Sequence, residues 1–258
     1  MLKCDFSTIK GAGVGRRIVL GEASSQPEGC LCVTVSGNLA GLRSGVMIEG
    51  GGKALLRVIS GNWTPGVPGA KSWTAEVMSE LPQGEVEVSL KKHGYSLAYV
   101  TLSDKGAAGM RKDEAGPLIA EMVKGALPLS IEQGYLIADE SDDLKALLMH
   151  LAHVCGFDLI MTTGGTGVGP RDVSPEATLA VIEKRLPGFE RAITATGLAK
   201  TPHAMISRAV AGTLGESIVV NFPGSPKAVR ESLDAVLPAL KHAVDKLQGD
   251  KTDCAQVL

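Results

Sequence analysis

Short segments of alternating apolar and polar residues make up the chain as far as about Gly94. Apolar positions recur at every second residue, the period of a β-strand, in CLCVTVSG (30–37) and EVEVSLKKHG (85–94), and KALLRVISG (53–61) is another candidate strand. Stretches rich in glycine and proline, such as NWTPGVPGAKSW (62–73), separate these segments, and no strong helical pattern interrupts them. The pattern predicts a small β-rich domain over residues 1–94, whose role it leaves open.

After Gly94 predicted strands alternate with predicted helices. The strand-like segments are YSLAYVTLSD (95–104), IEQGYLIADE (131–140), FDLIMTTGG (157–165) and ESIVVNFPG (216–224). Helical spacing is found in AGPLIAEMVKGA (115–126), SDDLKALLMHLAHVCG (141–156), SPEATLAVIEKRL (174–186) and SPKAVRESLDAVLPALKHAVDKL (225–247). In the third helix Ser174 is the predicted N-cap and Pro175 the first helical residue. This order predicts an α/β domain over 95–258, a mostly parallel sheet with helices on both faces.

Polar clusters stand where four of these strands end. They are Ser103-Asp104, Asp139-Glu140, TTGGTG (162–167) and NFPGSPK (221–227). In sheets of this class ligands bind outside the carboxyl ends of the strands. We therefore expect the four clusters to converge on one rim and to form a binding site there.

The segment TTGGTGVGPRDVSP (162–175) has the composition of an anion-binding loop. Its glycines remove Cβ atoms, so that backbone N–H groups can approach a ligand, and its threonines add hydroxyl donors. It has neither the Gly-Lys-Ser/Thr of a Walker A loop nor the Rossmann spacing. Asp172 would repel an anion unless a divalent cation such as Mg²⁺ bridges it to a nucleotide. The alternative is a tight turn in which Asp172 only caps a helix.

Composition excludes several classes of partner. Lys and Arg number 26 against 28 Asp and Glu, and aromatic residues are 3 %, so the chain lacks both the charge and the stacking groups of a nucleic-acid binder. No apolar run reaches the roughly 20 residues that span a bilayer, and the N-terminus has no secretory pattern. The spacing of Cys30 and Cys32 suits neither a zinc site nor a thioredoxin-type pair. We expect reduced thiols and a cytoplasmic protein.

The glycine-rich segment TTGGTGVGPRDVSPEAT (162–178) closely resembles the motif of the molybdopterin adenylyltransferase family. VTLSDKGAAGMRKDEAGP (100–117) is similar to the family's opening strand and Ser-Asp turn, and LIADESDDL (136–144) to its PDE segment, with Ala138 in place of the proline. PGFERA (187–192), HAMISRAVAG (203–212) and NFPGSPKAV (221–229) follow in the family's order. The resemblance covers about residues 95–250.

The resemblance implies an α/β fold, a homotrimer, and transfer of AMP from ATP to the terminal phosphate of molybdopterin with Mg²⁺, releasing pyrophosphate. It also implies hand-over of the product to the molybdenum-insertion enzyme. Asp139 and Asp172 match the acidic residues for catalysis and for positioning metal or pterin. Asp113 matches the first motif. The other residues that match phosphate- and substrate-binding positions are Ser103, Asp104, Thr163, Gly164, Gly165, Thr166, Gly167, Ser207, Arg208, Pro223, Gly224, Ser225 and Lys227.

Simpler roles stay open for several of these residues. Lys227 could be an ordinary solvated lysine, Ser207 and Arg208 an exposed helix start, and Asp104 and Asp113 turn caps.

This chain also departs from the family in places. Arg191 and Thr194 replace a glutamate and an arginine after PGF, which puts contacts from that helix in doubt. The β-rich domain has no counterpart in the minimal enzyme. If it handled sulfur or metal, Cys30 and Cys32 would be the residues to watch. A non-catalytic molybdopterin carrier and a molybdenum-insertion enzyme are the alternative functions, and the choice between molybdenum and tungsten is open.

Overall fold

The computed structural model describes residues 2–9, 11–22, 31–64 and 70–251. Internal contacts divide the chain into two compact units. The first holds residues 1–96 with 154–156, and the second holds 97–153 with 157–258. Cys30, one of the two cysteines noted above, lies outside the described residues.

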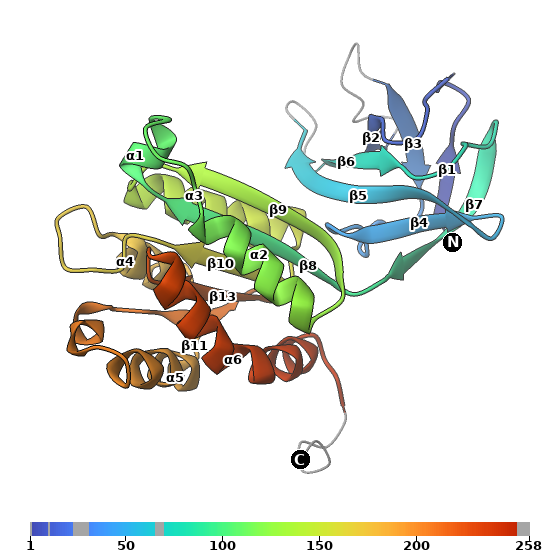
Figure 1. The fold of residues 1–258 in the computed structure, drawn as a ribbon. Coiled ribbons are helices and arrows are strands. Elements are labelled where there is room, and N and C mark those ends of the chain that lie inside the picture. The colour runs from blue at the N-terminus through green and yellow to red at the C-terminus, as the bar shows by residue number, and fades with distance from the viewer. Residues whose placement is uncertain (1, 10, 23–30, 65–69, 252–258) are drawn as a thin grey trace. The chain divides into compact units, whose positions relative to one another are not determined.

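Seven strands form a closed barrel in the first unit (Figure 1). Its strand order is β1-β3-β2-β6-β5-β4-β7, and all neighbouring strands are antiparallel except β2 and β3, which run parallel. The strands are β1 Leu2–Asp5, β2 Arg17–Gly21, β3 Cys32–Ser36, β4 Val46–Gly50, β5 Lys53–Trp63, β6 Lys71–Val77 and β7 Glu85–Lys92.

The alternation in the sequence accounts for the barrel core. Every second side chain of a strand points inward, and the inward set here is apolar, including Leu20, Val35, Ile48 and Leu56. Closure pairs every strand with two neighbours and so leaves no open sheet edge.

A six-stranded sheet forms the centre of the second unit, in the order β11-β12-β13-β10-β8-β9. The strands are β8 Tyr95–Leu102, β9 Leu129–Ile137, β10 Leu159–Thr163, β11 Lys184–Arg185, β12 Ala211–Leu214 and β13 Ser217–Phe222. All residues of β10 and β13 are buried, as expected for strands covered on both faces.

The prediction of a mostly parallel sheet is corrected by this structure. β10 runs parallel to β8 and to β13, but β12 is antiparallel to β13 and β11 is antiparallel to β12. The sheet is therefore mixed. β12 and β13 form a hairpin across Gly215 and Glu216, with Gly215 at φ +56°. The four-residue β12 is too short to show a period-two pattern, which is why the sequence did not reveal it.

Helices cover both faces of this sheet (Figure 1). α2 and α6 lie in front of it and α3 lies behind it in this view. α2 and α5 each pack against α6, and α3 packs against α4. The helices are α1 Asp104–Ala107, α2 Ala115–Ala126, α3 Ser141–Met149, the π-helix η2 His150–Cys155, α4 Ser174–Leu179, α5 Pro187–Leu198, the 3₁₀ helix η3 Pro202–Ile206 and α6 Pro226–Leu247. Within the described part of the chain, no helix combines the length and the apolar character that crossing a membrane requires.

Three helix predictions need correction. The helix expected over 174–186 ends at Leu179, and Lys184 and Arg185 form the short strand β11 instead. The helix expected over 141–156 is α-helical only to Met149 and continues as the π-helix η2. Ser174 is not an N-cap: α4 begins at Ser174, and its hydroxyl donates to the carbonyl of Gly164 at 2.8 Å. Because Ser174 is completely buried, its side chain is used to fix the preceding loop instead of the helix end.

Candidate active site

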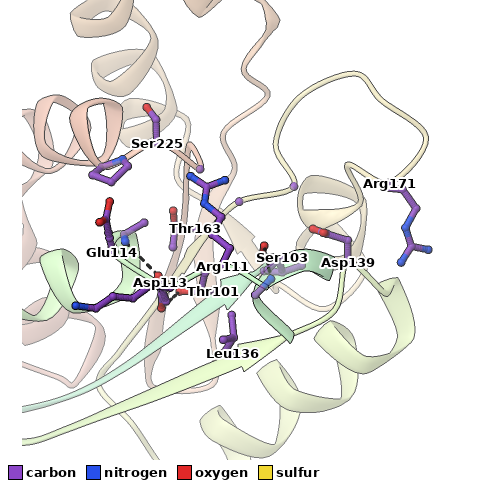
Figure 2. Close-up of a pocket in the computed structure, with 18 of the residues that line it drawn as sticks. Thr101, Ser103, Arg111, Asp113, Glu114, Leu136, Asp139, Thr163, Arg171 and Ser225 are labelled. Atoms are coloured by element: carbon purple, nitrogen blue, oxygen red, sulfur yellow. Dashed lines mark hydrogen bonds between the residues drawn. The ribbon is translucent and has the colours of Figure 1, made fainter. Parts of the chain in front are cut away.

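A cleft of about 340 Å³ lies at the carboxyl ends of four strands (Figure 2). We call it the main cleft. Its lining includes Ser103 after β8, Asp139 after β9, Gly164 and Gly165 after β10, and Ser225 after β13. The predicted convergence of four strand ends is thereby confirmed. The parallel pairing of β8, β10 and β13 brings their ends to one edge.

Asp104 and Asp139 join the ends of β8 and β9 by reciprocal hydrogen bonds. The amide of Asp104 donates to Oδ2 of Asp139 at 2.9 Å, and the amide of Asp139 donates to Oδ1 of Asp104 at 3.0 Å. Ser103 caps α1, since its hydroxyl accepts from the amide of Gly106 at 3.1 Å. These contacts hold the Asp139 carboxylate at the wall of the main cleft, whereas Asp104 itself does not line it.

The environment of Asp139 disfavours its charged form. Burial raises the pKa of Asp139, the hydrogen bond from the Asp104 amide opposes that shift, and the charges of Asp104 and Asp172 add to it. A divalent cation would reverse this effect by supplying the missing positive charge. The contribution from Asp172 also means that the two carboxylates lie within electrostatic range of each other.

Arg171 ties the glycine-rich loop to the other two loops. Its guanidinium donates to both carboxylate oxygens of Asp104, at 2.9 and 3.1 Å, and to Glu140 at 2.8 Å. These hydrogen bonds lower the pKa of Asp104. The groups are half exposed, so each pair alone is weak because solvent screens it, but together the pairs tie three loops to one another. Figure 2 shows Arg171 at the edge of the cleft beyond Asp139.

Glycine is required at two positions of the loop after β10. Gly164 has φ +96°, and a Cβ atom there would lie 2.3 Å from the carbonyl oxygen of Leu102. Gly165 has φ +61°, and its Cβ atom would lie 2.7 Å from Oγ of Ser174 and 3.3 Å from Oδ1 of Asp139. The bare backbone therefore passes directly beside the Asp139 carboxylate.

Asp172 closes the glycine-rich loop on itself. Its Oδ2 accepts the amide of Gly169 at 2.8 Å, and the same oxygen lies 2.7 Å from where a Cβ atom of Gly167 would be. Asp172 lines the main cleft, but Gly167 and Thr166 do not. Gly167 and Gly169 thus leave room for the carboxylate of Asp172. Thr163 lines the cleft and donates to the carbonyl of Pro223 at 2.6 Å, which links β10 to the loop after β13.

Arg208 supports the loop from outside the main cleft. Its guanidinium donates to the carbonyls of Gly167 and Asp172 at 2.7 and 2.9 Å and pairs with Glu176. Its own amide donates to the carbonyl of Thr166 at 3.0 Å. Arg208 is therefore placed to hold the loop, not to face the cleft.

Three more predicted residues also lie away from the main cleft lining. Ser207 and Pro223 line a separate, smaller cavity of about 220 Å³ under α5 and η3. The Ser207 hydroxyl is buried there and has no hydrogen-bond partner within the residues that the structure describes. Lys227 is exposed on α6 and lines neither cavity, whereas Gly224 and Ser225 do line the main cleft.

The two departures from the family lie on α5, away from the main cleft. Arg191 is exposed, and Thr194 donates to the carbonyl of Glu190 at 2.8 Å within the helix. Both line a shallow surface hollow between this helix and residues 207–209. A charge change at these positions therefore leaves the lining of the main cleft untouched.

Sequence reasoning missed the cations on one side of the main cleft. Arg111 and Lys112 line it but were not chosen as site residues, and neither was Arg171. The available signal was the pair of basic residues directly before Asp113, within the motif that follows Ser103. The pair lies on a loop between a short helix and α2, where local periodicity gives no direction for side chains.

The carboxylates present fit a magnesium ion that arrives with a substrate. Among the residues described, no group of three or more His, Cys, Asp or Glu side chains could hold a metal ion alone. Asp139 and Asp172 bring two carboxylates to the main cleft. Mg²⁺ is usually bound by one or two carboxylates together with substrate phosphates and water, so this donor set suits it.

Comparison with known proteins agrees with this geometry. The family described as a probable molybdopterin binding domain matches residues 98–242, more than half of the chain. The chain belongs to this family. The matched region includes all four strand ends of the main cleft, and the barrel lies outside it.

Curated relatives are identical to this chain at a third or more of the aligned positions. A molybdopterin adenylyltransferase from Helicobacter pylori strain J99 is 38 % identical over 155 residues, 60 % of this chain and 88 % of the relative. One from Escherichia coli K12 is 35 % identical over 149 residues, 57 % of this chain and 76 % of the relative.

Solved structures extend the likeness to the fold. The molybdopterin biosynthesis enzyme MoaB from Thermus thermophilus is 42 % identical, with a TM-score of 0.57. The alignment covers 60 % of this chain and 98 % of that structure. The family fold is thus the second unit alone.

Proposed function

We propose that this chain is a molybdopterin adenylyltransferase of molybdenum cofactor biosynthesis. It transfers AMP from ATP to the terminal phosphate of molybdopterin. The observation that carries the proposal is the main cleft, which is lined by the backbone of Gly164 and Gly165 together with the carboxylates of Asp139 and Asp172. The names of the relatives that align over this same region support the same reaction.

In this reaction an oxygen of the molybdopterin phosphate attacks the α-phosphorus of ATP. The bond between that phosphorus and the oxygen bridging to the β-phosphorus breaks, and pyrophosphate leaves with the electron pair. The enzyme needs to supply no nucleophile, so its work is to align two anions and to screen their charge. Bound Mg²⁺, held by Asp139 and Asp172, would neutralise part of the charge on the phosphates.

The remaining contacts of the site keep these groups in place. The exchange of hydrogen bonds between Asp104 and Asp139 aims one carboxylate, and Arg208 holds the loop that carries the other. Ser174 fixes Gly164 at the start of the loop. A site held this rigidly loses little entropy when the substrates bind.

Broader predictions accompany the proposal. We propose a β-rich domain over 1–94 and a catalytic domain over 95–258, with the enzyme assembled as a homotrimer. We also place it in the cytoplasm, with hand-over of adenylated molybdopterin to the molybdenum-insertion enzyme. Sedimentation of the purified protein tests the homotrimer directly.

The decisive test is release of pyrophosphate by the purified chain with ATP, Mg²⁺ and molybdopterin. The wild type should release pyrophosphate only when molybdopterin is present. Asp139→Asn and Asp172→Asn should each slow it by about two orders of magnitude, as loss of one preorganised charged group typically does. Asp142→Asn is the matched control, because Asp142 is exposed on α3 and does not line the main cleft.

The alternatives have distinct outcomes in the same assay. Tight binding of molybdopterin without formation of adenylated product would indicate a carrier. Consumption of adenylated molybdopterin with molybdate would indicate the insertion step. Either result contradicts the proposed reaction.

A further inference from the structure

The cations around the main cleft fall into two groups. Arg171 is paired with Asp104 and Glu140, and Arg208 is occupied by loop carbonyls and Glu176. Neither can leave these partners without loosening the loops they hold. Arg111 and Lys112, in contrast, line the cleft without an ion pair to any described residue.

Two acids follow this basic pair and line the cleft, Asp113 and Glu114, and the carboxylate of Asp113 is hydrogen-bonded within the protein. Oδ2 of Asp113 accepts the hydroxyl of Thr101 at 2.7 Å, and Oδ1 accepts the amides of Ala115 and Gly116 at 3.1 and 3.0 Å (Figure 2). The packing is tight, since a Cβ atom on Gly116 would lie 2.5 Å from both Asp113 and Thr101. Asp113 therefore anchors its loop to β8 and to the start of α2.

This anchor holds the two residues that precede it in the chain. Three hydrogen bonds fix the backbone at Asp113, so the attachment points of Arg111 and Lys112 are fixed as well. Figure 2 shows Arg111 rising through the cleft on the side of Asp113, with Asp139 on the other side. Glu114 lines the cleft on this same side. We call the side that holds Arg111 and Lys112 the basic end, and the side that holds Asp139 and Asp172 the acidic end.

We propose that Arg111 and Lys112 bind a phosphate group of a substrate at the basic end, and that Asp113 is their positioning residue. The inference rests on the proposed function, because it gives these cations the phosphate chemistry of that reaction. A guanidinium and an ammonium suit a phosphate that carries two or more negative charges. Phosphate bound here keeps negative charge away from Asp139 and Asp172, the residues that would hold Mg²⁺.

The test measures binding of inorganic pyrophosphate without Mg²⁺, so that the acidic end contributes no attraction. Arg111→Gln/Lys112→Gln should weaken the affinity of the full-length chain by about tenfold or more, the effect expected for loss of charge-assisted hydrogen bonds. Lys200→Gln/Arg230→Gln removes the same charges from exposed positions that line neither cavity described above, and it should change the affinity less than about twofold. Equal effects of the two double variants would overturn the proposal.

Separate titrations with ATP and molybdopterin identify the source of the phosphate. If the basic end takes the ATP polyphosphate, the Arg111/Lys112 variant weakens binding of ATP and leaves molybdopterin unchanged. If it takes the molybdopterin phosphate, the pattern is reversed. No change with either substrate contradicts the proposal.

The role of Asp113 is tested by non-additivity. Asp113→Ala alone should weaken pyrophosphate binding, as the Arg111/Lys112 variant does. Added to that variant, Asp113→Ala should cause no further loss of affinity. A merely structural role would lower the affinity equally in both backgrounds. Asp113→Glu, which restores the acceptor, should recover part of the affinity.

Failure of this inference and failure of the proposed function give different results. A wild type that binds pyrophosphate through Arg111 but forms no adenylated molybdopterin contradicts only the reaction. If the wild type catalyses adenylation and the double substitution Arg111→Gln/Lys112→Gln leaves the KM of both substrates unchanged, only the proposed phosphate binding at the basic end is contradicted.

Discussion

Single side chains hold the glycine-rich loop in its conformation, and Arg208 is the main one. Its guanidinium satisfies two loop carbonyls and pairs with Glu176, three contacts that come from residues 32 to 41 positions away. A loop of glycines has little structure of its own, because glycine loses more conformational freedom than any other residue when it is fixed. One half-buried arginine therefore supplies order that the loop sequence does not.

The Arg208→Gln variant should be less stable than the wild type and should catalyse adenylation more slowly. The lost bonds to the carbonyls of Gly167 and Asp172 should cost about 1–3 kcal/mol of unfolding free energy, measured in urea. Arg208→Lys keeps the charge but not the forked geometry, so it should recover only part of the loss. Unchanged stability and turnover in both variants would contradict a loop-holding role.

The same substitution should change the titration of Glu176. Arg208 lowers the pKa of Glu176 below its ordinary value of 4.5, so this pair stabilises the fold above that pH, and the stabilisation is lost as pH falls through the lowered pKa. In Arg208→Gln the pKa of Glu176 should rise toward 4.5, as followed by NMR of its carboxyl carbon. An unmoved titration would mean that the pair is absent in solution.

Cys4 illustrates how burial governs the chemistry of a thiol. It is fully buried in the barrel, and burial raises its pKa to about 12. At about pH 8 the reactive thiolate is therefore scarce, and iodoacetamide should label Cys4 far more slowly in the native protein than in urea. Peptide mass spectrometry resolves this cysteine from the others. Equal rates would show that the barrel opens readily.

At the scale of elements, the sequence predicted the strands better than it predicted the contacts made in the turns that follow them. Periodicity located β8, β9, β10 and β13 correctly, because alternation and apolar runs are local properties. It missed the hairpin partner β12 and wrongly predicted Ser174 to be an N-cap. Those features depend on residues distant in the sequence, such as the carbonyl of Gly164 that Ser174 meets.

Gly164→Ala should damage the fold at this turn. Alanine at φ +96° is strained, and its Cβ would clash with the carbonyl of Leu102, so we expect a loss of about 2–4 kcal/mol in unfolding free energy. Gly188→Ala in α5 is the control, since its Cβ meets no atom within 4 Å. It should be neutral or up to about 1 kcal/mol more stable. Thermal unfolding of the two variants decides the matter.

At the scale of the whole molecule, the two units can be observed by separate signals. The only two tryptophans, Trp63 and Trp73, belong to the barrel, whereas every described α-helix belongs to the second unit. Tryptophan fluorescence therefore reports the barrel, and far-ultraviolet circular dichroism reports chiefly the family domain.

We expect the two signals to give different unfolding midpoints in urea, because each unit has its own core. ATP with Mg²⁺ should raise the circular dichroism midpoint and leave the fluorescence midpoint in place, since ligand binding stabilises only the unit that binds. Coincident transitions that shift together would show that the two units unfold as one.

Sequence alone determined most strands and helices of the second unit, the strand-end position of Asp139 and the place of Asp172 in the glycine-rich loop, because hydrophobic period and glycine content act over a few residues. Only the tertiary structure decided which groups meet. Arg171 donates to Asp104 across 67 positions, and Asp113 accepts the hydroxyl of Thr101 on β8 beside Arg111 in the cleft. Such contacts depend on how strands are ordered in the sheet, and strand order is set by packing of the whole chain, which no local pattern encodes.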